Sequence, residues 1–264
     1  MVADHRKPPD LTDTFADHFA PVAAHYATFR PHYPATLFAW LASLTPGRVL
    51  AWDCAAGSGQ ASPALAAYFD RVVATDASAA QIAVAVPHPQ VDYRVAPAED
   101  SGLPSASVDL ITVAQALHWF DLDHFYAEVR RVLKPGGVLA VWSYGVLTVA
   151  EAAVNRQLQR FYQETIGPYW PPERRHVESG YQSLPLPFPE LQPPTFDMEV
   201  SWTLSELLGY CRSWSASERY HAECGHDPVI DLAAELMPLW RRPDQRQLIT
   251  WPLVLRVAKK PIAL

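Results

Sequence analysis

The chain has 264 residues and a net charge of −7, with 21 Lys and Arg against 28 Asp and Glu. This length suits one large α/β domain, and without a basic excess we expect no nucleic-acid partner. The three cysteines, Cys54, Cys211 and Cys224, are too few and too far apart for a zinc site or a disulfide scaffold, so we expect no metal and a reduced, cytoplasmic location. No segment approaches the roughly 20 apolar residues of a membrane span, so we expect no membrane partner.

The first 46 residues predict helices. Residues 10–30 carry aromatic and apolar side chains at helical spacing, and Pro31 and Pro34 end that pattern. A second helix is predicted over residues 35–44. We therefore expect residues 1–46 to form an N-terminal helical cap.

Strands and helices alternate in the next hundred residues. Apolar runs predict the strands, and segments with helical periodicity lie between them. The predicted strands are 48–53, 72–76, 91–96, 107–113 and 138–142, and the predicted helices are 61–69, 79–84 and 123–133. This order specifies a parallel, doubly wound sheet over the core, residues 47–145.

The remainder of the chain is less regular. A helix is predicted over 149–165, but a proline-rich stretch at 185–194 interrupts regular structure. We interpret residues 146–193 as a lid that shapes an acceptor pocket. The predicted strands at 196–203 and 248–259 and the helix at 204–214 lead us to expect that residues 194–264 complete the sheet of a single domain, residues 1–264.

The first predicted strand runs into a loop of small residues, Asp53-Cys54-Ala55-Ala56-Gly57-Ser58-Gly59-Gln60. It is similar to the start of a dinucleotide-binding G-x-G-x-x-G motif. In that motif the first glycine directly follows the strand and the helix N-terminus holds a pyrophosphate, whereas here Asp53 and three small residues intervene. A carboxylate repels phosphate but suits a cation such as the α-amino group of S-adenosylmethionine. The loop therefore favours this cofactor over a nicotinamide.

Further candidate residues follow the other predicted strands. Asp76 ends the second strand, where a carboxylate can accept hydrogen bonds from both ribose hydroxyls. Ala98-Glu99 follows the third strand, and residues 115–120 follow the fourth. Open α/β sheets bind their ligands at the carboxyl ends of the strands, so these residues predict one shared site.

Taken together, these motifs resemble the class I S-adenosylmethionine-dependent methyltransferases, in particular the small-molecule group similar to trans-aconitate methyltransferase. The resemblance covers nearly the whole chain. It rests on residues 26–34, 53–60, 74–76, 98–100, 108–112, 116–119 and 132–137. It implies a Rossmann-like, doubly wound α/β fold with a seven-stranded, mostly parallel sheet, an antiparallel final strand, N-terminal helices and a helical lid insertion. The chain departs from the commoner family pattern at Ala55-Ala56 and Ser58, and at Pro97, where many relatives carry an adenine-binding acid.

The resemblance also implies roles for individual residues. Tyr26 and Arg30 would reach the methionine end of the cofactor, although an aromatic and an arginine four residues apart on a helix often just stack. Asp76 would hold the ribose, and Ala98 and Glu99 would border the adenine. The cofactor-binding residues expected for S-adenosyl-L-methionine and its product S-adenosyl-L-homocysteine are Tyr26, Arg30, Asp53, Ala55, Gly57, Gly59, Gln60, Asp76, Ala77, Ala98, Glu99 and Gln115.

The acceptor chamber is predicted to contain His118, Trp119 and Tyr144. His118 is either a base or the cap of the next turn, whereas Trp119 is expected to wall the chamber. A carboxylate is already nucleophilic at neutral pH and needs only donors, for which Arg174, Arg175 and Tyr181 are candidates, whereas a phenol or an amine needs a base.

We therefore expect in-line methyl transfer to a small-molecule acceptor, with a carboxylate (O-methylation) as the first candidate. The alternatives are a cofactor-binding protein of the same fold without turnover and a nicotinamide-dependent oxidoreductase. The sequence does not distinguish a monomer from a dimer.

Overall fold

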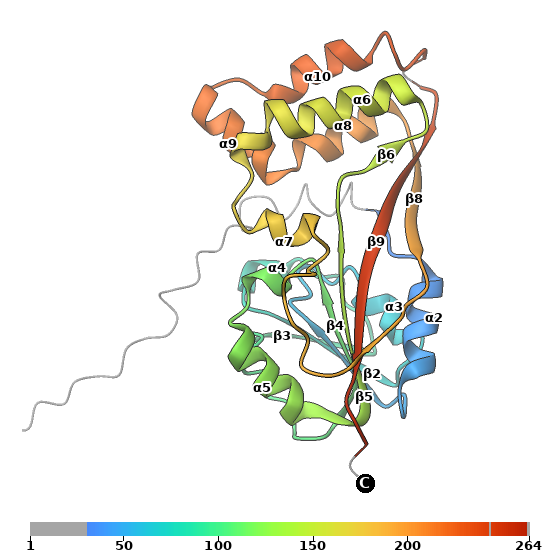
Figure 1. Ribbon diagram of the computed structural model, residues 1–264, viewed down its shortest axis with the longest axis vertical. Coiled ribbons are helices and arrows are strands. Elements are labelled where there is room, and N and C mark those ends of the chain that lie inside the picture. The colour runs from blue at the N-terminus through green and yellow to red at the C-terminus, as the bar shows by residue number, and fades with distance from the viewer. Residues whose placement is uncertain (1–30, 243, 263–264) are drawn as a thin grey trace, which may run out of the picture.

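The computed structural model describes residues 31–242 and 244–262. Figure 1 shows a sheet flanked by helices and, beyond one end of its strands, a second layer made mainly of helices. The first predicted helix lies outside the described residues. Tyr26 and Arg30 lie outside them as well, so their contacts with the cofactor stay predictions.

A single sheet forms the centre of the molecule. In the part of the chain that the structure describes it has nine strands, in the order β3-β2-β1-β4-β5-β9-β6, and β7 and β8 also pair with β9. The strands from β3 to β5 are parallel to one another, and β9 is antiparallel to all its partners. The strands are β1 (Leu50–Cys54), β2 (Arg71–Asp76), β3 (Val91–Val95), β4 (Val108–Ala114), β5 (Leu133–Tyr144), β6 (Thr148–Val149), β7 (Glu190–Leu191), β8 (Phe196–Trp202) and β9 (Gln247–Lys259).

This topology confirms the predicted Rossmann-like fold with a mostly parallel sheet and an antiparallel final strand. The strand count differs from the expected seven because β6 and β7, of two residues each, also pair with β9. A hydrophobic pattern cannot reveal strands this short, since two residues show no periodicity.

The long strand β9 connects the two layers. Its C-terminal half pairs with β5, from Leu253 opposite Tyr144 to Lys259 opposite Val138. Its N-terminal half pairs with β8, from Gln247 opposite Trp202. In Figure 1 β9 therefore runs from the helical layer down along the sheet, beside β5.

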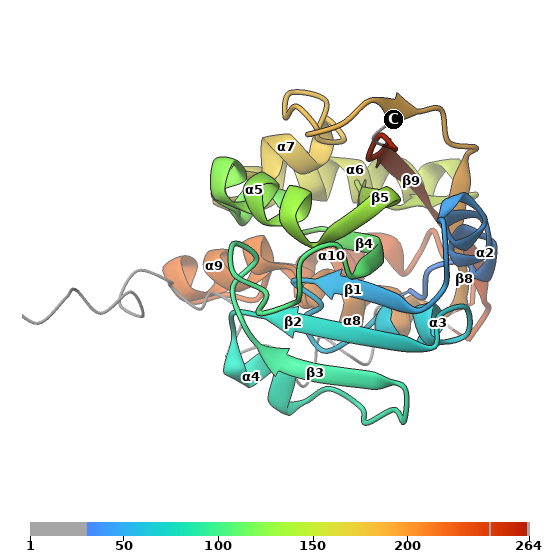
Figure 2. The same cartoon turned by 90° about the horizontal axis from the view of Figure 1, so that it is seen from below.

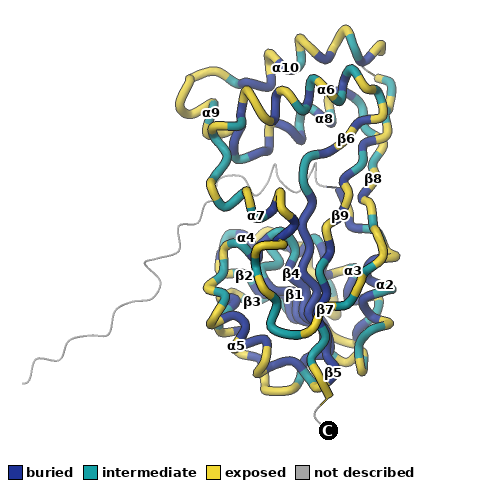
Figure 3. Tube along the Cα trace, in the orientation of Figure 1, coloured by how far each residue is buried: buried dark blue, intermediate teal, exposed yellow. Residues whose placement is uncertain are grey.

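Helices cover both faces of the parallel sheet (Figure 2). Neighbouring residues of β1 show the two faces, since Ala51 packs in one hydrophobic core with α2 and α3, and Trp52 packs in the other with α5. Because both faces are covered, the central strands are almost wholly buried (Figure 3) and read as continuous apolar runs in the sequence. The helices of this layer are α2 (Ala35–Leu44), α3 (Ser62–Ala66), α4 (Ala79–Ala83), the short η2 (Leu117–Trp119) and α5 (Leu122–Val132).

The second layer contains helices from two parts of the chain. The capping box between Thr203 and Glu206 starts α8, and Asp227 caps α10 ahead of Pro228. The elements are α6 (Ala152–Arg160), η3 (Phe161–Thr165), η4 (Gly167–Tyr169), α8 (Leu204–Arg212), α9 (Ser215–Cys224) and α10 (Pro228–Leu236), with α7 (Arg174–Glu178) between the layers. Residues 204–236 thus lie with the 146–193 segment, whereas β8 and β9 complete the sheet. None of the helices described is long and apolar enough to cross a membrane.

Candidate active site

The loop after β1 has the backbone geometry expected of a glycine-rich turn. Ala55, Gly57 and Gly59 have φ values of 54°, 58° and 85°, in the left-handed region that glycine adopts most easily. The backbone N–H of Gly57 donates to the Asp76 carboxylate at 2.8 Å, and the N–H of Ser78 donates to the same carboxylate at 2.9 Å. Asp76 therefore fixes the loop after β1 to the end of β2.

Gly59 also leaves no room for a side chain. A Cβ built on this residue would lie 2.6 Å from the hydroxyl oxygen of Tyr93 and 2.7 Å from its ring. Tyr93 belongs to β3, so the ring reaches under the loop from two strands away. Both the conformation and the space therefore require glycine at this position.

Asp53 is buried, with 1% of its surface exposed, and its partners are hydroxyl groups. Ser62 Oγ donates to one carboxylate oxygen at 2.6 Å, and Thr112 Oγ1 donates to the other at 2.9 Å. Burial raises the pKa of Asp53 to about 6, although these two hydrogen bonds oppose the rise. Asp53 thus joins β1 to α3 and β4, and its predicted contact with an ammonium group stays a prediction.

Four of the other predicted cofactor residues lie within the described ranges and follow or adjoin the ends of β1, β2 and β3. Ala98 is buried, Ala77 is exposed, and Glu99 accepts a hydrogen bond from the backbone N–H of Asp121 at 3.0 Å. The side-chain amide of Gln60 donates to the backbone carbonyl of Pro31.

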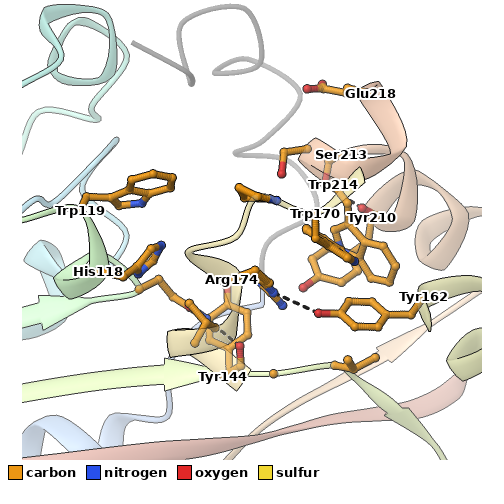
Figure 4. Close-up of a pocket in the computed structure, with 16 residues that line it drawn as sticks. His118, Trp119, Tyr144, Tyr162, Trp170, Arg174, Tyr210, Ser213, Trp214 and Glu218 are labelled. Atoms are coloured by element: carbon orange, nitrogen blue, oxygen red, sulfur yellow. Dashed lines mark hydrogen bonds between the residues drawn. The ribbon is translucent and has the colours of Figure 1, made fainter. Parts of the chain in front are cut away.

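A pocket lies where this edge meets the helical layer (Figure 4). All three predicted chamber residues line it, together with Gln115 from the cofactor set. Gln115 has a φ of 59°, and its side-chain amide donates to the Tyr144 carbonyl at 2.9 Å. From the side of the sheet the lining comprises Gln115, His118, Trp119 and Tyr144, and from α7 and the helical layer it includes Tyr162, Trp170, Arg174, Tyr210, Ser213, Trp214 and Glu218.

Arg174 lies between aromatic rings in this pocket. Its guanidinium carbon is 4.6 Å from the ring centroid of Trp170 and 5.8 Å from that of Tyr162, and its Nε donates to the Tyr162 hydroxyl at 3.0 Å. Tyr162 in turn donates to Glu178 at 2.7 Å. Within residues 31–242 and 244–262, no carboxylate lies within ion-pair distance of Arg174. Arg174 is therefore a pocket cation that is held in place by aromatic residues and forms no ion pair with any acid of the described ranges.

The neighbouring Arg175 is exposed and does not line the pocket. Tyr181 does not line it either, but its hydroxyl lies 3.0 Å from Nδ1 of His118. Burial lowers the pKa of His118 to about 4, and the positive charges of Arg174 and His176 add to this effect. At neutral pH His118 is therefore an uncharged imidazole.

The sequence reasoning missed several residues of the site. Ser62 and Thr112 lie in or beside the motifs but were not assigned to the site, because only the tertiary structure brings their hydroxyl groups to Asp53. Tyr162, Tyr210 and Trp214 come from helices whose placement the sequence did not give, and a count of aromatic residues was the only available signal. No three His, Cys, Asp or Glu side chains of the described ranges form a candidate metal site.

Comparisons with known proteins place this geometry in a family. A family model described as a methyltransferase domain matches residues 52–141. A Dictyostelium discoideum protein named as a methyltransferase is 36% identical over 254 residues, which cover 93% of this chain and 96% of that protein. A methyltransferase-like protein of Schizosaccharomyces pombe is 32% identical, with coverage of 90% and 94%. The solved structure of an Anaeromyxobacter dehalogenans protein, described as a type II methyltransferase, is 48% identical with a TM-score of 0.85 over 89% of this chain and all of that one.

The chain therefore belongs to the class I S-adenosylmethionine-dependent methyltransferases, as its motifs predicted. Family membership gives the reaction class, methyl transfer, and removes the nicotinamide-dependent oxidoreductase from the alternatives. The names of these relatives state no acceptor, so the substrate has to be argued from the pocket.

Proposed function

We propose that this protein transfers the methyl group of S-adenosylmethionine to a carboxylate oxygen of a small-molecule acceptor, forming a methyl ester. The observation that carries the proposal is Arg174, a guanidinium in the pocket without a carboxylate partner among the described residues. A guanidinium is the donor group that best matches a carboxylate, because it can donate two parallel hydrogen bonds to the two oxygens.

The aromatic surroundings of Arg174 support this assignment. Stacking on Trp170 and the hydrogen bond to Tyr162 limit the orientations of the guanidinium, so less side-chain entropy is lost when an acceptor binds. Water is also partly excluded by these rings, which strengthens the attraction between a cation and an anionic acceptor. The site thus favours a carboxylate over a neutral or cationic acceptor.

Glu218 is the carboxylate that favours the competing acceptor class, an amine. It also lines the pocket, but its side chain is largely exposed. Glu218 is only partly desolvated, and this desolvation raises its pKa. Arg174 is the better held of the two charges, and this difference is why we propose an acid as the acceptor.

The loop after β1 and the end of β2 suit the cofactor. The Asp76 carboxylate accepts the backbone N–H groups of Gly57 and Ser78 and is thereby fixed at the end of β2, where a carboxylate can accept hydrogen bonds from ribose hydroxyls. Gly57 and Gly59 present backbone rather than side chains along the loop. Ala98 offers a small apolar surface beside them for a base, and Gln115 and Tyr144 join this end of the site to the pocket.

The protein would accordingly contribute alignment rather than acid–base chemistry. S-adenosylmethionine, when bound, supplies an electrophilic methyl group, and a carboxylate is ionised at neutral pH and needs no base. Arg174 would hold one end of the acceptor while the aromatic residues exclude water. Holding two reactants in line contributes several kcal/mol to catalysis in favourable cases, up to about 7–11.

The test is an acceptor panel with the full chain. S-adenosylmethionine labelled in its methyl group is incubated with small mono-, di- and tricarboxylates and with matched phenols and amines. We expect label in carboxylates, and release of labelled methanol from the product in mild alkali, as only an ester gives. Label that is stable to alkali, in a phenol or an amine, would overturn the carboxylate assignment.

The same panel distinguishes the remaining alternative. A protein that only binds the cofactor would bind S-adenosylhomocysteine in calorimetry, yet transfer no label to any acceptor class. That result would contradict the proposed turnover while leaving the assignment of the fold intact.

A further inference from the structure

Two residues from different elements meet behind the pocket wall. His118, in η2, lines the pocket, whereas Tyr181, in the turn after α7, is completely buried and does not line it. The Tyr181 hydroxyl lies 3.0 Å from Nδ1 of His118, and the two rings are stacked with centroids 5.8 Å apart and an angle of 26° between their planes. The phenol of a buried tyrosine therefore contacts Nδ1 of His118.

The backbone holds Tyr181 in an uncommon conformation for this contact. Its φ is 59°, in the left-handed region that costs a residue with a Cβ about 1 kcal/mol or more. The preceding Gly180 has a φ of 61°, and a Cβ there would clash with the side chain of Val254. The Tyr181 carbonyl accepts a hydrogen bond from Arg256, which also pairs with Glu190. Strand β9 thus braces the turn that orients the phenol.

The surroundings of the phenol set the direction of its hydrogen bond. Burial raises the pKa of Tyr181 far above its ordinary value, so the hydroxyl keeps its proton. The hydroxyl is buried, and among the described residues its hydrogen-bond partner is Nδ1 of His118 at 3.0 Å. A buried hydroxyl needs an acceptor for its proton, and Nδ1 of His118 is the acceptor within hydrogen-bond distance among the described residues, so we infer that the phenol donates to Nδ1.

A neutral imidazole that accepts at Nδ1 carries its proton on Nε2. The pKa of His118 is lowered to about 4 by burial and by the charges of Arg174 and His176, so this ring is neutral at physiological pH. The nitrogen that remains available to a ligand in the pocket is Nε2, and in this tautomer it is a hydrogen-bond donor and not a base.

We propose that Tyr181 is a positioning residue, which holds His118 in the tautomer protonated on Nε2 so that His118 donates a hydrogen bond to the acceptor. The part that concerns the acceptor rests on the proposed function, since a carboxylate needs donors and an un-ionised phenol needs a base. Arg174 and His118 would then bind the acceptor from two sides of one pocket. The part that concerns the tautomer stands on Tyr181 and His118 alone.

The tautomer is measured directly by long-range ¹H–¹⁵N NMR on the full chain labelled with ¹⁵N-histidine. His118→Gln identifies the signals of His118 by their loss. Near pH 7 we expect the ¹⁵N chemical shift of an unprotonated nitrogen at Nδ1 and that of a protonated nitrogen at Nε2. In Tyr181→Phe we expect both chemical shifts to move toward the values of a mixture of the two tautomers. Tyr126→Phe is the matched control, because Tyr126 is also buried but donates to the Pro185 carbonyl, and it should leave the signals unchanged.

Two outcomes would overturn the proposal: a proton on Nδ1 of His118 in the unmodified chain, or the same tautomer in Tyr181→Phe. The spectra need no acceptor, so they decide the tautomer even if the panel contradicts the carboxylate. With a carboxylate substrate, Tyr181→Phe should lower kcat/KM about 10-fold, the effect of a misplaced hydrogen bond. Tyr126→Phe should leave kcat/KM unchanged, and an unchanged kcat/KM in Tyr181→Phe would also contradict the proposal.

Discussion

Ser62 donates a hydrogen bond of 2.6 Å to the carboxylate of Asp53 and so joins the start of α3 to the end of β1. Because the pKa of Asp53 is about 6 in the folded chain and near 4 in an unfolded one, its contribution to stability is complete below about pH 4 and is lost as the pH rises through 6. The carboxylate of Asp53 is therefore ionised at neutral pH at a cost to folding.

Asp53→Asn should remove this cost. We expect the variant to be more stable than the unmodified chain at pH 7, by up to about 3 kcal/mol, with a difference that disappears near pH 4. Denaturant unfolding at several pH values between 4 and 7 measures it. Asp70→Asn, at an exposed site, is the control substitution. A variant of Asp53 that is less stable than the unmodified chain at pH 7 would contradict the account.

Gly59→Ala should damage the loop after β1. Alanine is unfavourable at the φ of 85° that residue 59 adopts, and its Cβ would clash with the Tyr93 ring. We therefore expect a loss of about 2–4 kcal/mol in unfolding free energy and weaker binding of S-adenosylhomocysteine. Gly102→Ala is the matched control, because its φ is 65° but nothing lies within 4 Å of its Cβ. Equal losses in the two variants, measured by thermal and denaturant unfolding, would mean that the contact with Tyr93 is unimportant.

Asp76→Ala should weaken the binding of the cofactor. The substitution removes the carboxylate assigned to the ribose and the hydrogen bond that it accepts from Gly57, and we expect the dissociation constant of S-adenosylhomocysteine to rise about 10- to 100-fold. Isothermal titration calorimetry measures the change, and Asp92→Ala, on the surface of β3, serves as the control. An unchanged affinity in Asp76→Ala would remove Asp76 from the cofactor site.

Asp109 should behave in the opposite way, as a structural residue. It lies near the start of β4, away from the site, where its buried carboxylate accepts backbone N–H groups of Val49 and Leu50 and pairs with Lys134 at 2.8 Å. Asp109→Ala leaves these donors unpaired and should cost about 3–5 kcal/mol in denaturant unfolding. The folded variant should bind S-adenosylhomocysteine with unchanged affinity, and a marked loss of affinity would contradict a purely structural role.

The sequence predicted the parallel core well because its signals are local. Strands β1, β2 and β4 are buried on both faces, which produces apolar runs, and the glycine loop and Asp76 lie at strand ends that a periodic pattern locates. The position of the helical layer was harder to predict. Helices α8 to α10 follow β8 in the sequence but lie with α6, and only long-range packing decides that.

The site shows the same division between local and long-range signals. Arg174 and Arg175 were equal candidates in the sequence, yet successive residues of a helix point about 100° apart, so only one of them lines the pocket. Likewise, no spacing rule connects Tyr181 with His118, because the contact depends on a left-handed turn and on the position of β9.

The carboxylate assignment is tested most directly by kcat/KM for the acceptor that the panel identifies, compared between Arg174→Ala and Arg175→Ala. Loss of the guanidinium in the pocket should lower kcat/KM about 10- to 100-fold, whereas loss of the exposed one next to it should leave kcat/KM unchanged. Equal activities of the two variants toward a carboxylate, or preferential methylation of an amine or a phenol by the unmodified chain, would contradict the proposal that Arg174 binds an acidic acceptor.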